Sequence, residues 1–175
     1  MTVRALSRGT ACLLCAAAAT APALALGATT TDYIETPALI VAGDDAELEA
    51  AQARAKQGLG QFLQRLRSRS GTDIEFAVQA EITRGDVTEA VWLSGVRLGR
   101  RNHVSGRVHA DPILLSELRA GQSLTIALAQ VTDWVIVERT LTGERVVGGY
   151  TVKLMREREV RGIVPEYLAH DAGVL

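Results

Sequence analysis

The sequence predicts an α+β domain in which one long N-terminal helix packs on an antiparallel sheet of about five or six strands. Between residues 45 and 70 apolar side chains recur at spacings of three and four, which is the period of an amphipathic helix. From Ile74 onward the period changes to two, which is typical of half-buried strands. Tight turns between the short strands favour antiparallel pairing, and the helix stripe would cover the apolar face of the sheet.

The first 25 residues have the features of a signal peptide. Arg4 and Arg8 precede an apolar run from Ala11 to Leu26, and Ala23-Leu24-Ala25 supplies the small residues of a cleavage site. We expect cleavage after Ala25, which predicts an exported protein, either periplasmic or secreted, with no transmembrane segment after cleavage. A retained anchor is the alternative, but the run is shorter than the ~20 residues that span a bilayer.

Lipidation at Cys15 or Cys12 is a further alternative to simple cleavage. It is disfavoured because Leu14 is not a small residue and almost no apolar stretch precedes Cys12. Removal of residues 1–25 takes away both cysteines and two arginines, so 17 basic residues face 20 acidic ones. Because the remaining chain has no cysteine, thiol chemistry is excluded. Its excess of acidic over basic residues argues against a nucleic-acid partner.

Residues 26–43 are expected to form a leader that ends in the apolar run Ala38-Leu39-Ile40-Val41, either one strand or a docking segment. Next comes the predicted helix. Asp44 or Asp45 can cap it, and Gly71 has the character of a residue just beyond its end. The domain is predicted over residues 44–156, followed by a tail over 157–175.

The predicted strands follow in order. Ile74–Ile82 alternates strictly, Val87–Leu98 contains Trp92, and residues 103–110 separate an apolar from a polar face before Pro112 ends the run. Residues 124–128 give a fourth strand. Residues 134–138 and 146–155 predict a final hairpin around Thr142-Gly143, with a bulge or a close backbone approach at Gly148-Gly149.

Three groups of polar residues are candidates for chemistry. His109 and Asp111 share a strand face and could approach one metal ion, whereas His103 is about 20 Å away along a straight strand. Two ligands on one strand are a weak signal, and a solvated polar face is the favoured interpretation. Arg97, Arg100, Arg101 and Arg107 could form a basic patch around one hairpin, and a further alternative is that these arginines bind anionic lipid, polysaccharide or another acidic partner. We assign no catalytic, cofactor-binding or metal-binding residues.

The third group is the pair Asp133-Trp134, which has two interpretations. An acid beside an indole could be a shielded general acid with a raised pKa or part of a binding cleft. The favoured alternative is that Trp134 anchors the core while Asp133 bonds local backbone N–H groups.

A series of short motifs resembles a known family. The series comprises Phe76-Ala77-Val78, Glu89-Ala90-Val91-Trp92, Ala110-Asp111-Pro112, Leu118-Arg119-Ala120-Gly121, Val131-Thr132-Asp133-Trp134 and Gly148-Gly149-Tyr150-Thr151. It resembles the bacterial YegJ-like family, domain of unknown function 2314 (DUF2314), over residues 44–156. The resemblance implies a fold-level grouping and supplies no activity, cofactor or catalytic residue.

The sequence therefore favours a non-catalytic, exported domain that binds a protein or another envelope component. The candidate binding surface is Trp92, Asp133, Trp134 and Tyr150. The alternative is a hydrolase or ligand-binding enzyme that uses Asp133 with His109 and Asp111, with or without a metal. The oligomeric state is left open.

Overall fold

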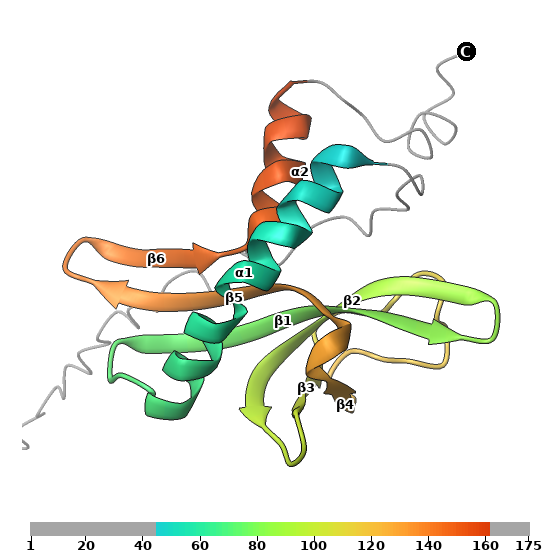
Figure 1. Ribbon diagram of the computed structural model, residues 1–175, viewed down its shortest axis with the longest axis horizontal. Coiled ribbons are helices and arrows are strands. Elements are labelled where there is room, and N and C mark those ends of the chain that lie inside the picture. The colour runs from blue at the N-terminus through green and yellow to red at the C-terminus, as the bar shows by residue number, and fades with distance from the viewer. Residues whose placement is uncertain (1–44, 162–175) are drawn as a thin grey trace, which may run out of the picture.

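The computed structural model describes residues 45–161, which form a helix, six strands and a second helix (Figure 1). The predictions for residues 1–25 and 26–43 lie outside the described residues, as does the tail from residue 162 onward. The elements are α1 (Ala46–Ser68), β1 (Asp73–Arg84), β2 (Val87–Leu98), β3 (His103–Val108), β4 (Ser123–Ala127), a short 3-10 helix η2 (Leu128–Gln130), β5 (Val131–Thr140), β6 (Gly143–Gly148) and α2 (Tyr150–Val160).

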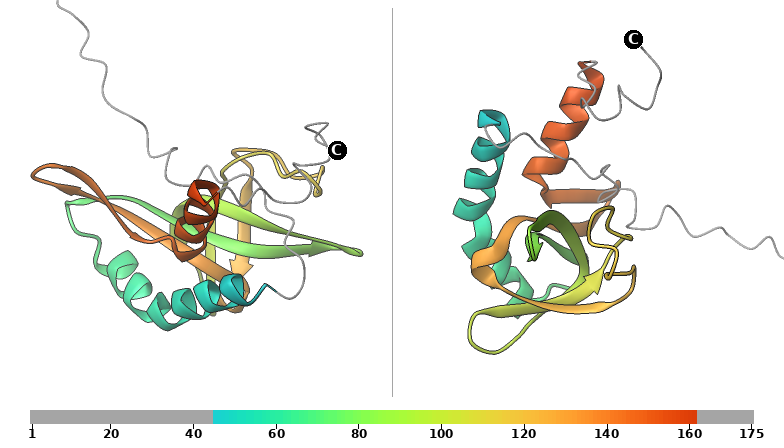
Figure 2. Two further views of the ribbon diagram at one scale, coloured as in Figure 1. Left: turned by 90° about the horizontal axis from the view of Figure 1, so that it is seen from above. Right: turned by 90° about the vertical axis from the view of Figure 1, so that its right-hand side faces the viewer.

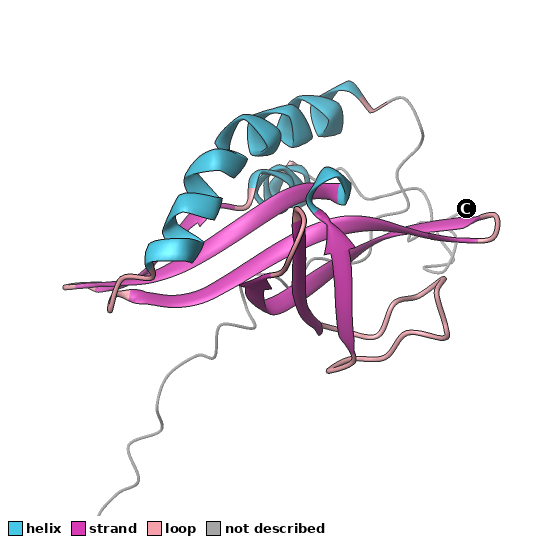
Figure 3. Cartoon of the chain, turned by 60° about the horizontal axis from the view of Figure 1, so that its bottom comes forward, coloured by secondary structure: helices cyan, strands magenta, loops and turns pink. Residues whose placement is uncertain are grey.

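The strands form one antiparallel sheet in the order β4-β3-β2-β1-β5-β6. Helix α1 lies along one face, and the sheet is strongly twisted from one edge to the other (Figures 2 and 3). The predicted fold class is thus confirmed, with a second helix added at the C-terminal end. Among the described residues, no helix has the length and apolar character needed to cross a membrane.

Helix α1 begins where the sequence predicts and ends slightly earlier. The Asp45 carboxylate accepts a hydrogen bond from Leu48 N–H at 3.0 Å and so caps the first turn. The helix ends at Ser68, with Arg69 as its C-cap at a φ of 27°, so the prediction that Gly71 follows the helix directly is wrong. The Arg69 guanidinium instead donates to Val96 O at 2.7 Å, which holds this end of the helix against β2.

The main core lies between α1 and the sheet. It contains Phe62 and Leu66 from the helix and alternating residues of the strands, such as Val78, Leu93 and Ile136. A smaller apolar cluster occupies the opposite face of the sheet: Ala77, Trp92, Val135, Val137 and Val152, with Ile74 and Val146 packed against it. Because strand side chains alternate between faces, the two clusters share strands but not residues.

Two glycines of α1 are expected to respond oppositely to alanine. A Cβ at Gly58 would lie 2.7 Å from Cζ2 of the buried Trp134 ring, whereas a Cβ at Gly60 would meet nothing within 4 Å. Overpacking costs about 1–3 kcal/mol, and removing a helical glycine gains about 0.5–1 kcal/mol. Gly58→Ala should therefore lower the free energy of unfolding and Gly60→Ala should raise it, as measured by urea denaturation. Equal effects would contradict the packing of Trp134 on α1.

The strand predicted over residues 146–155 is wrong beyond Gly148. Strand β6 ends there, and helix α2 begins at Tyr150, so α2 also crosses the predicted domain end at residue 156. The reversal occurs at Gly148 and Gly149, whose φ angles of 83° and 65° are left-handed and suit glycine. A strand cannot continue through two such residues.

Helix α2 is joined to the start of α1 by ion pairs. The Arg158 guanidinium donates to both carboxylate oxygens of Asp45 at 2.5 and 2.6 Å and to Glu47 Oε2 at 2.9 Å, and Arg161 also approaches Glu47. The hydrogen bond from Arg158 is the main cause that lowers the pKa of Asp45 to about 2. The two helices therefore contact each other at the ends that lie farthest from the sheet (Figure 1).

Acid should weaken this junction. A carboxyl whose pKa is lower in the folded than in the unfolded state stabilises the fold above about pH 3.8, and that stabilisation is lost as the pH falls toward 2. We expect the free energy of unfolding to fall more steeply between about pH 4 and 2 in the wild type than in Asp45→Asn. The control Glu49→Gln, an exposed change in the same helical turn, should keep the wild-type slope. Parallel profiles for the wild type and Asp45→Asn would refute this role of Asp45.

Candidate binding surface

Asp133 and Trp134 are neighbours on β5 and therefore point to opposite faces of the sheet. Trp134 belongs to the main core, where its Nε1–H donates to Ala55 O of α1 at 2.8 Å and its ring lies 5.5 Å from that of Phe62. The half-buried Tyr150 ring meets it edge-on at 6.0 Å. The interpretation of Trp134 as a core anchor is confirmed.

The Asp133 carboxylate is fully buried and bonded within the fold. It accepts hydrogen bonds from Trp134 N–H, Thr151 N–H and the Thr151 hydroxyl, each at 2.7 Å. The N-cap residue of α2 is Gly149, which has no side chain, so Asp133 supplies the capping oxygens from another element. Burial raises the pKa of Asp133 above its usual value, and these hydrogen bonds oppose part of that rise. The interpretation that Asp133 bonds backbone N–H groups is confirmed.

Gly148 completes this arrangement. A Cβ there would lie 2.2 Å from Trp134 O and 2.6 Å from Cε3 of its ring, and Gly149 N–H donates to the same Trp134 O at 2.8 Å. The predicted close backbone approach is therefore confirmed. Together with Asp133 and Thr151, these contacts give two of the motifs that carry the family resemblance, Val131-Thr132-Asp133-Trp134 and Gly148-Gly149-Tyr150-Thr151, a structural role, which is to attach α2 to β5.

Trp92 shares a face with Asp133. The strand register places Asp133, Gln79 and Trp92 side by side across β5, β1 and β2. His109, the residue after the end of β3, donates its N–H to Trp92 O. Trp92 is 8% exposed, and its buried Nε1 has no hydrogen-bond partner among residues 45–161. Of the four predicted surface residues, the structure thus places Trp92 and Asp133 on one face and packs Trp134 and Tyr150 in the main core.

The residues of the alternative enzymatic interpretation lie apart. His109 and Asp133 are separated by β1 and β2, so three strand spacings of roughly 4.8 Å place their backbones about 14 Å apart. Asp111 accepts a hydrogen bond from Ala120 N–H at 2.7 Å, and His103 Nδ1 contacts the carbonyls of Arg100 and Arg101. Within the described part of the chain, no three His, Cys, Asp or Glu side chains are placed to hold a metal ion.

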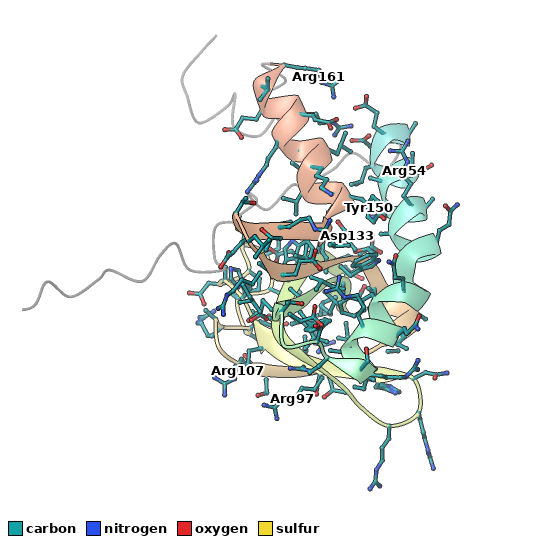
Figure 4. All side chains as sticks on the ribbon, turned by 90° about the vertical axis from the view of Figure 1, so that its left-hand side faces the viewer. Arg54, Arg97, Arg107, Asp133, Tyr150 and Arg161 are labelled. Atoms are coloured by element: carbon teal, nitrogen blue, oxygen red, sulfur yellow. The ribbon has the colours of Figure 1, made fainter. Side chains whose placement is uncertain are left out.

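The predicted basic patch is assembled by β2, β3 and β4. Across β2 and β3, Ser94 pairs with Arg107 and Arg97 pairs with Ser105; on β4, Ser123 and Thr125 are opposite Arg107 and Ser105. Paired residues of antiparallel strands share a face, and Figure 4 shows Arg97 and Arg107 projecting outward near each other. We call Arg97, Arg100, Arg101, Arg107, Ser105, Ser123 and Thr125 the arginine face.

The charges of the arginine face are not neutralised within the described residues. Its four arginines are exposed and form no ion pair there, whereas Arg65, Arg145, Arg158 and Arg161 each pair with a carboxylate. Glu75 lies nearby, but its carboxylate accepts a hydrogen bond from Gly95 N–H at the β2 bulge. The face therefore presents four positive charges and several hydroxyl groups to solvent.

Sequence reasoning missed three contributors to these sites. Ser123 and Thr125 alternate with apolar residues, which was a signal for a polar face, but their position beside β3 depends on the strand order. Gln79 had no sequence signal, although its side chain accepts hydrogen bonds from Thr132 and Thr151 at 3.3 Å.

Residues 45–165 match a family described as "Uncharacterized protein conserved in bacteria (DUF2314)". The match covers the whole described fold and confirms the predicted grouping, although it does not test the YegJ-like label. Comparisons with curated proteins and with solved structures found no match.

Proposed function

This chain belongs to the DUF2314 family of uncharacterised bacterial proteins, and from that premise we propose that it is an exported, non-catalytic domain that binds anionic lipid headgroups of the cell envelope. The observation that carries the proposal is the arginine face, with four exposed arginines that have no carboxylate partner among residues 45–161. Export is supported by the signal-peptide pattern of residues 1–25.

The chemistry of the arginine face suits phosphate groups. A guanidinium presents a planar fork of donors that matches phosphate oxygens, and hydroxyl groups such as those of Ser105 and Thr125 can donate to the same oxygens. Each arginine near an anionic membrane surface contributes about 1 kcal/mol.

The turn between β2 and β3 supports a functional role for its arginines. Arg101 and Asn102 adopt φ angles of 51° and 60°, a left-handed conformation that favours glycine or asparagine over arginine. A non-glycine residue whose backbone is held in such a conformation costs of order 1 kcal/mol, and residues of this kind cluster at functional sites. The cost of placing an arginine at this position supports a role for its charge.

Vesicle binding tests the proposal. We expect the mature chain, residues 26–175, to bind vesicles that contain phosphatidylglycerol but not neutral phosphatidylcholine vesicles, and binding should weaken with added salt. The double variant Arg97→Gln/Arg107→Gln should bind about 30-fold more weakly, which corresponds to about 2 kcal/mol. The matched control is Arg54→Gln/Arg67→Gln, which removes the same charge from two exposed arginines of α1, of which Arg54 is labelled in Figure 4.

Three outcomes would overturn this proposal. The first is equal vesicle affinity of the wild type and Arg97→Gln/Arg107→Gln. The second is an equal loss of vesicle affinity in both double variants, which would indicate that binding depends on net charge alone. The third is preferential binding to a soluble anionic polysaccharide over phosphatidylglycerol vesicles, which would refute the lipid assignment.

Export is tested separately by N-terminal sequencing of the protein from the producing cells, with Leu26 expected as the first residue.

A further inference from the structure

Strand β4 forms one edge of the sheet, because it pairs with β3 on one side and with no other strand among residues 45–161 (Figure 1). Just past its end, Leu128 N–H donates to Asn102 O at 2.8 Å in the register of the β3–β4 pair. In an antiparallel pair, residues that bond to the partner strand alternate with residues that do not. Ser123 and Thr125 therefore turn their backbone N–H and C=O groups away from β3.

The outward backbone groups of β4 are open to solvent, since these two residues are both exposed. The next outward N–H, that of Ala127, is bonded to Gln130 Oε1 at 3.0 Å, which ends the open stretch. Strand β6 at the opposite edge carries Glu144 and Arg145, and charged side chains on an edge strand discourage the addition of another strand. Strand β4 contains neither a charged residue nor a proline, so its edge can accept one.

The side chains beside this edge determine which strand it would accept. Residues of an added strand opposite Ser123 and Thr125 would share the arginine face, where Arg107 is the neighbour of Ser123. Two strand spacings, about 10 Å, separate the backbone of Arg107 from the added strand, and a long arginine can reach across the short Ser123 side chain. Acidic side chains suit these positions. On the other face, the half-buried Leu124 packs against the main core and favours apolar neighbours.

We propose that the edge of β4 binds an extended segment of another protein in which acidic and apolar residues alternate, and that this segment adds antiparallel to β4. Every strand pair of the sheet is antiparallel, and such pairing is slightly more stable than parallel pairing. A second copy of this chain fits less well, because antiparallel pairing of two β4 edges would bring two arginine faces together. The inference does not rest on the proposed lipid binding, since it requires the backbone of β4.

The variant Thr125→Pro tests the edge directly. Proline removes an outward N–H and leaves the hydrogen bonds to β3 in place. We expect the mature chain, residues 26–175, to bind a short blocked peptide in which glutamate alternates with valine, as measured by calorimetry. Thr125→Pro should weaken this binding at least tenfold. The control Thr125→Val keeps the N–H and should bind within about twofold of the wild type. Vesicle binding should be unchanged in Thr125→Pro, because the arginines remain.

Two methylated peptides test the pairing without any change to the protein. In the antiparallel arrangement the glutamates lie opposite Ser123 and Thr125, so their N–H groups point to β4 and the valine N–H groups point away. N-methylation of the glutamates should therefore abolish binding, whereas N-methylation of the valines should preserve it. This comparison also applies if Thr125→Pro does not fold.

Wild-type peptide affinity in Thr125→Pro, with a folded chain by circular dichroism, would refute the proposal. Equal affinities of the two methylated peptides would do the same, because the contact would then not involve the backbone. Equal binding of a peptide with lysine in place of glutamate would exclude the acidic partner. A dimer of the mature chain that dissociates in Thr125→Pro would assign the edge to a second copy and overturn the assignment to another protein.

Discussion

Gly148→Ala is expected to lower the free energy of unfolding by about 3 kcal/mol or more. Two effects add at this position. The φ of 83° is unfavourable for any residue with a Cβ, and the new Cβ would lie 2.2 Å from Trp134 O. Relief of this clash would require β6 to move away from β5 at the place where Asp133 and Thr151 attach α2. Urea denaturation measures the loss directly.

Gly121→Ala is the matched control for Gly148→Ala. Gly121 has a similar φ of 79°, but a Cβ there would meet nothing within 4 Å. Its alanine variant should therefore show only the conformational cost, about 1–2 kcal/mol. If the two variants lose the same stability, the close approach of Gly148 to Trp134 does not exist in solution.

Removal of the Glu89 carboxylate is expected to have the second large effect. Glu89 is buried, and its carboxylate accepts backbone hydrogen bonds from Ile113, Leu114 and Leu115 at 2.7, 2.9 and 3.0 Å. These contacts hold the irregular connection between β3 and β4 against β2. Glu89→Gln keeps the size of the side chain but places an amide NH2 group in front of N–H donors. We expect a loss of about 2–4 kcal/mol, because backbone donors remain unsatisfied.

Hydrogen exchange at residues 113–115 distinguishes a local from a global effect of Glu89→Gln. Faster exchange there, with β1 and β5 still protected, would show that the carboxylate orders the connection. Glu81→Gln is the control, since Glu81 is exposed on the neighbouring strand β1 and pairs with Ala90. Equal stability of the two variants would contradict the role assigned to Glu89.

The α+β architecture was predictable because its signals are local. The stripe of α1 and the alternation in β1 each depend on side chains a few residues apart, and a single period identifies each element. Helix α2 was not predictable in this way. Residues 146–155 also alternate, and the cap that starts the helix comes from Asp133, 18 residues before Thr151. No window of neighbouring residues contains that information.

The candidate surfaces were predictable to different degrees. The clustering of Arg97, Arg100, Arg101 and Arg107 follows from one hairpin, so sequence alone identified it. The separation of Trp92 from Trp134 depends on which face each strand residue takes, and that follows from the register of β1 with β2 and β5. Glu89 was missed because nothing near it in the sequence indicates that the backbone of residues 113–115 returns to β2.

The contact between Arg158 and Asp45 has a consequence for chain connectivity. It brings the beginning and the end of the described domain together, since Asp45 precedes α1 and Arg158 lies in the last turns of α2. A short linker between residues 161 and 45 would leave every strand pair intact, and the chain could be opened at the β5–β6 turn, where Leu141 is fully exposed. We therefore expect a circularly permuted chain that begins at Gly143 and ends at Thr142 to form the same fold.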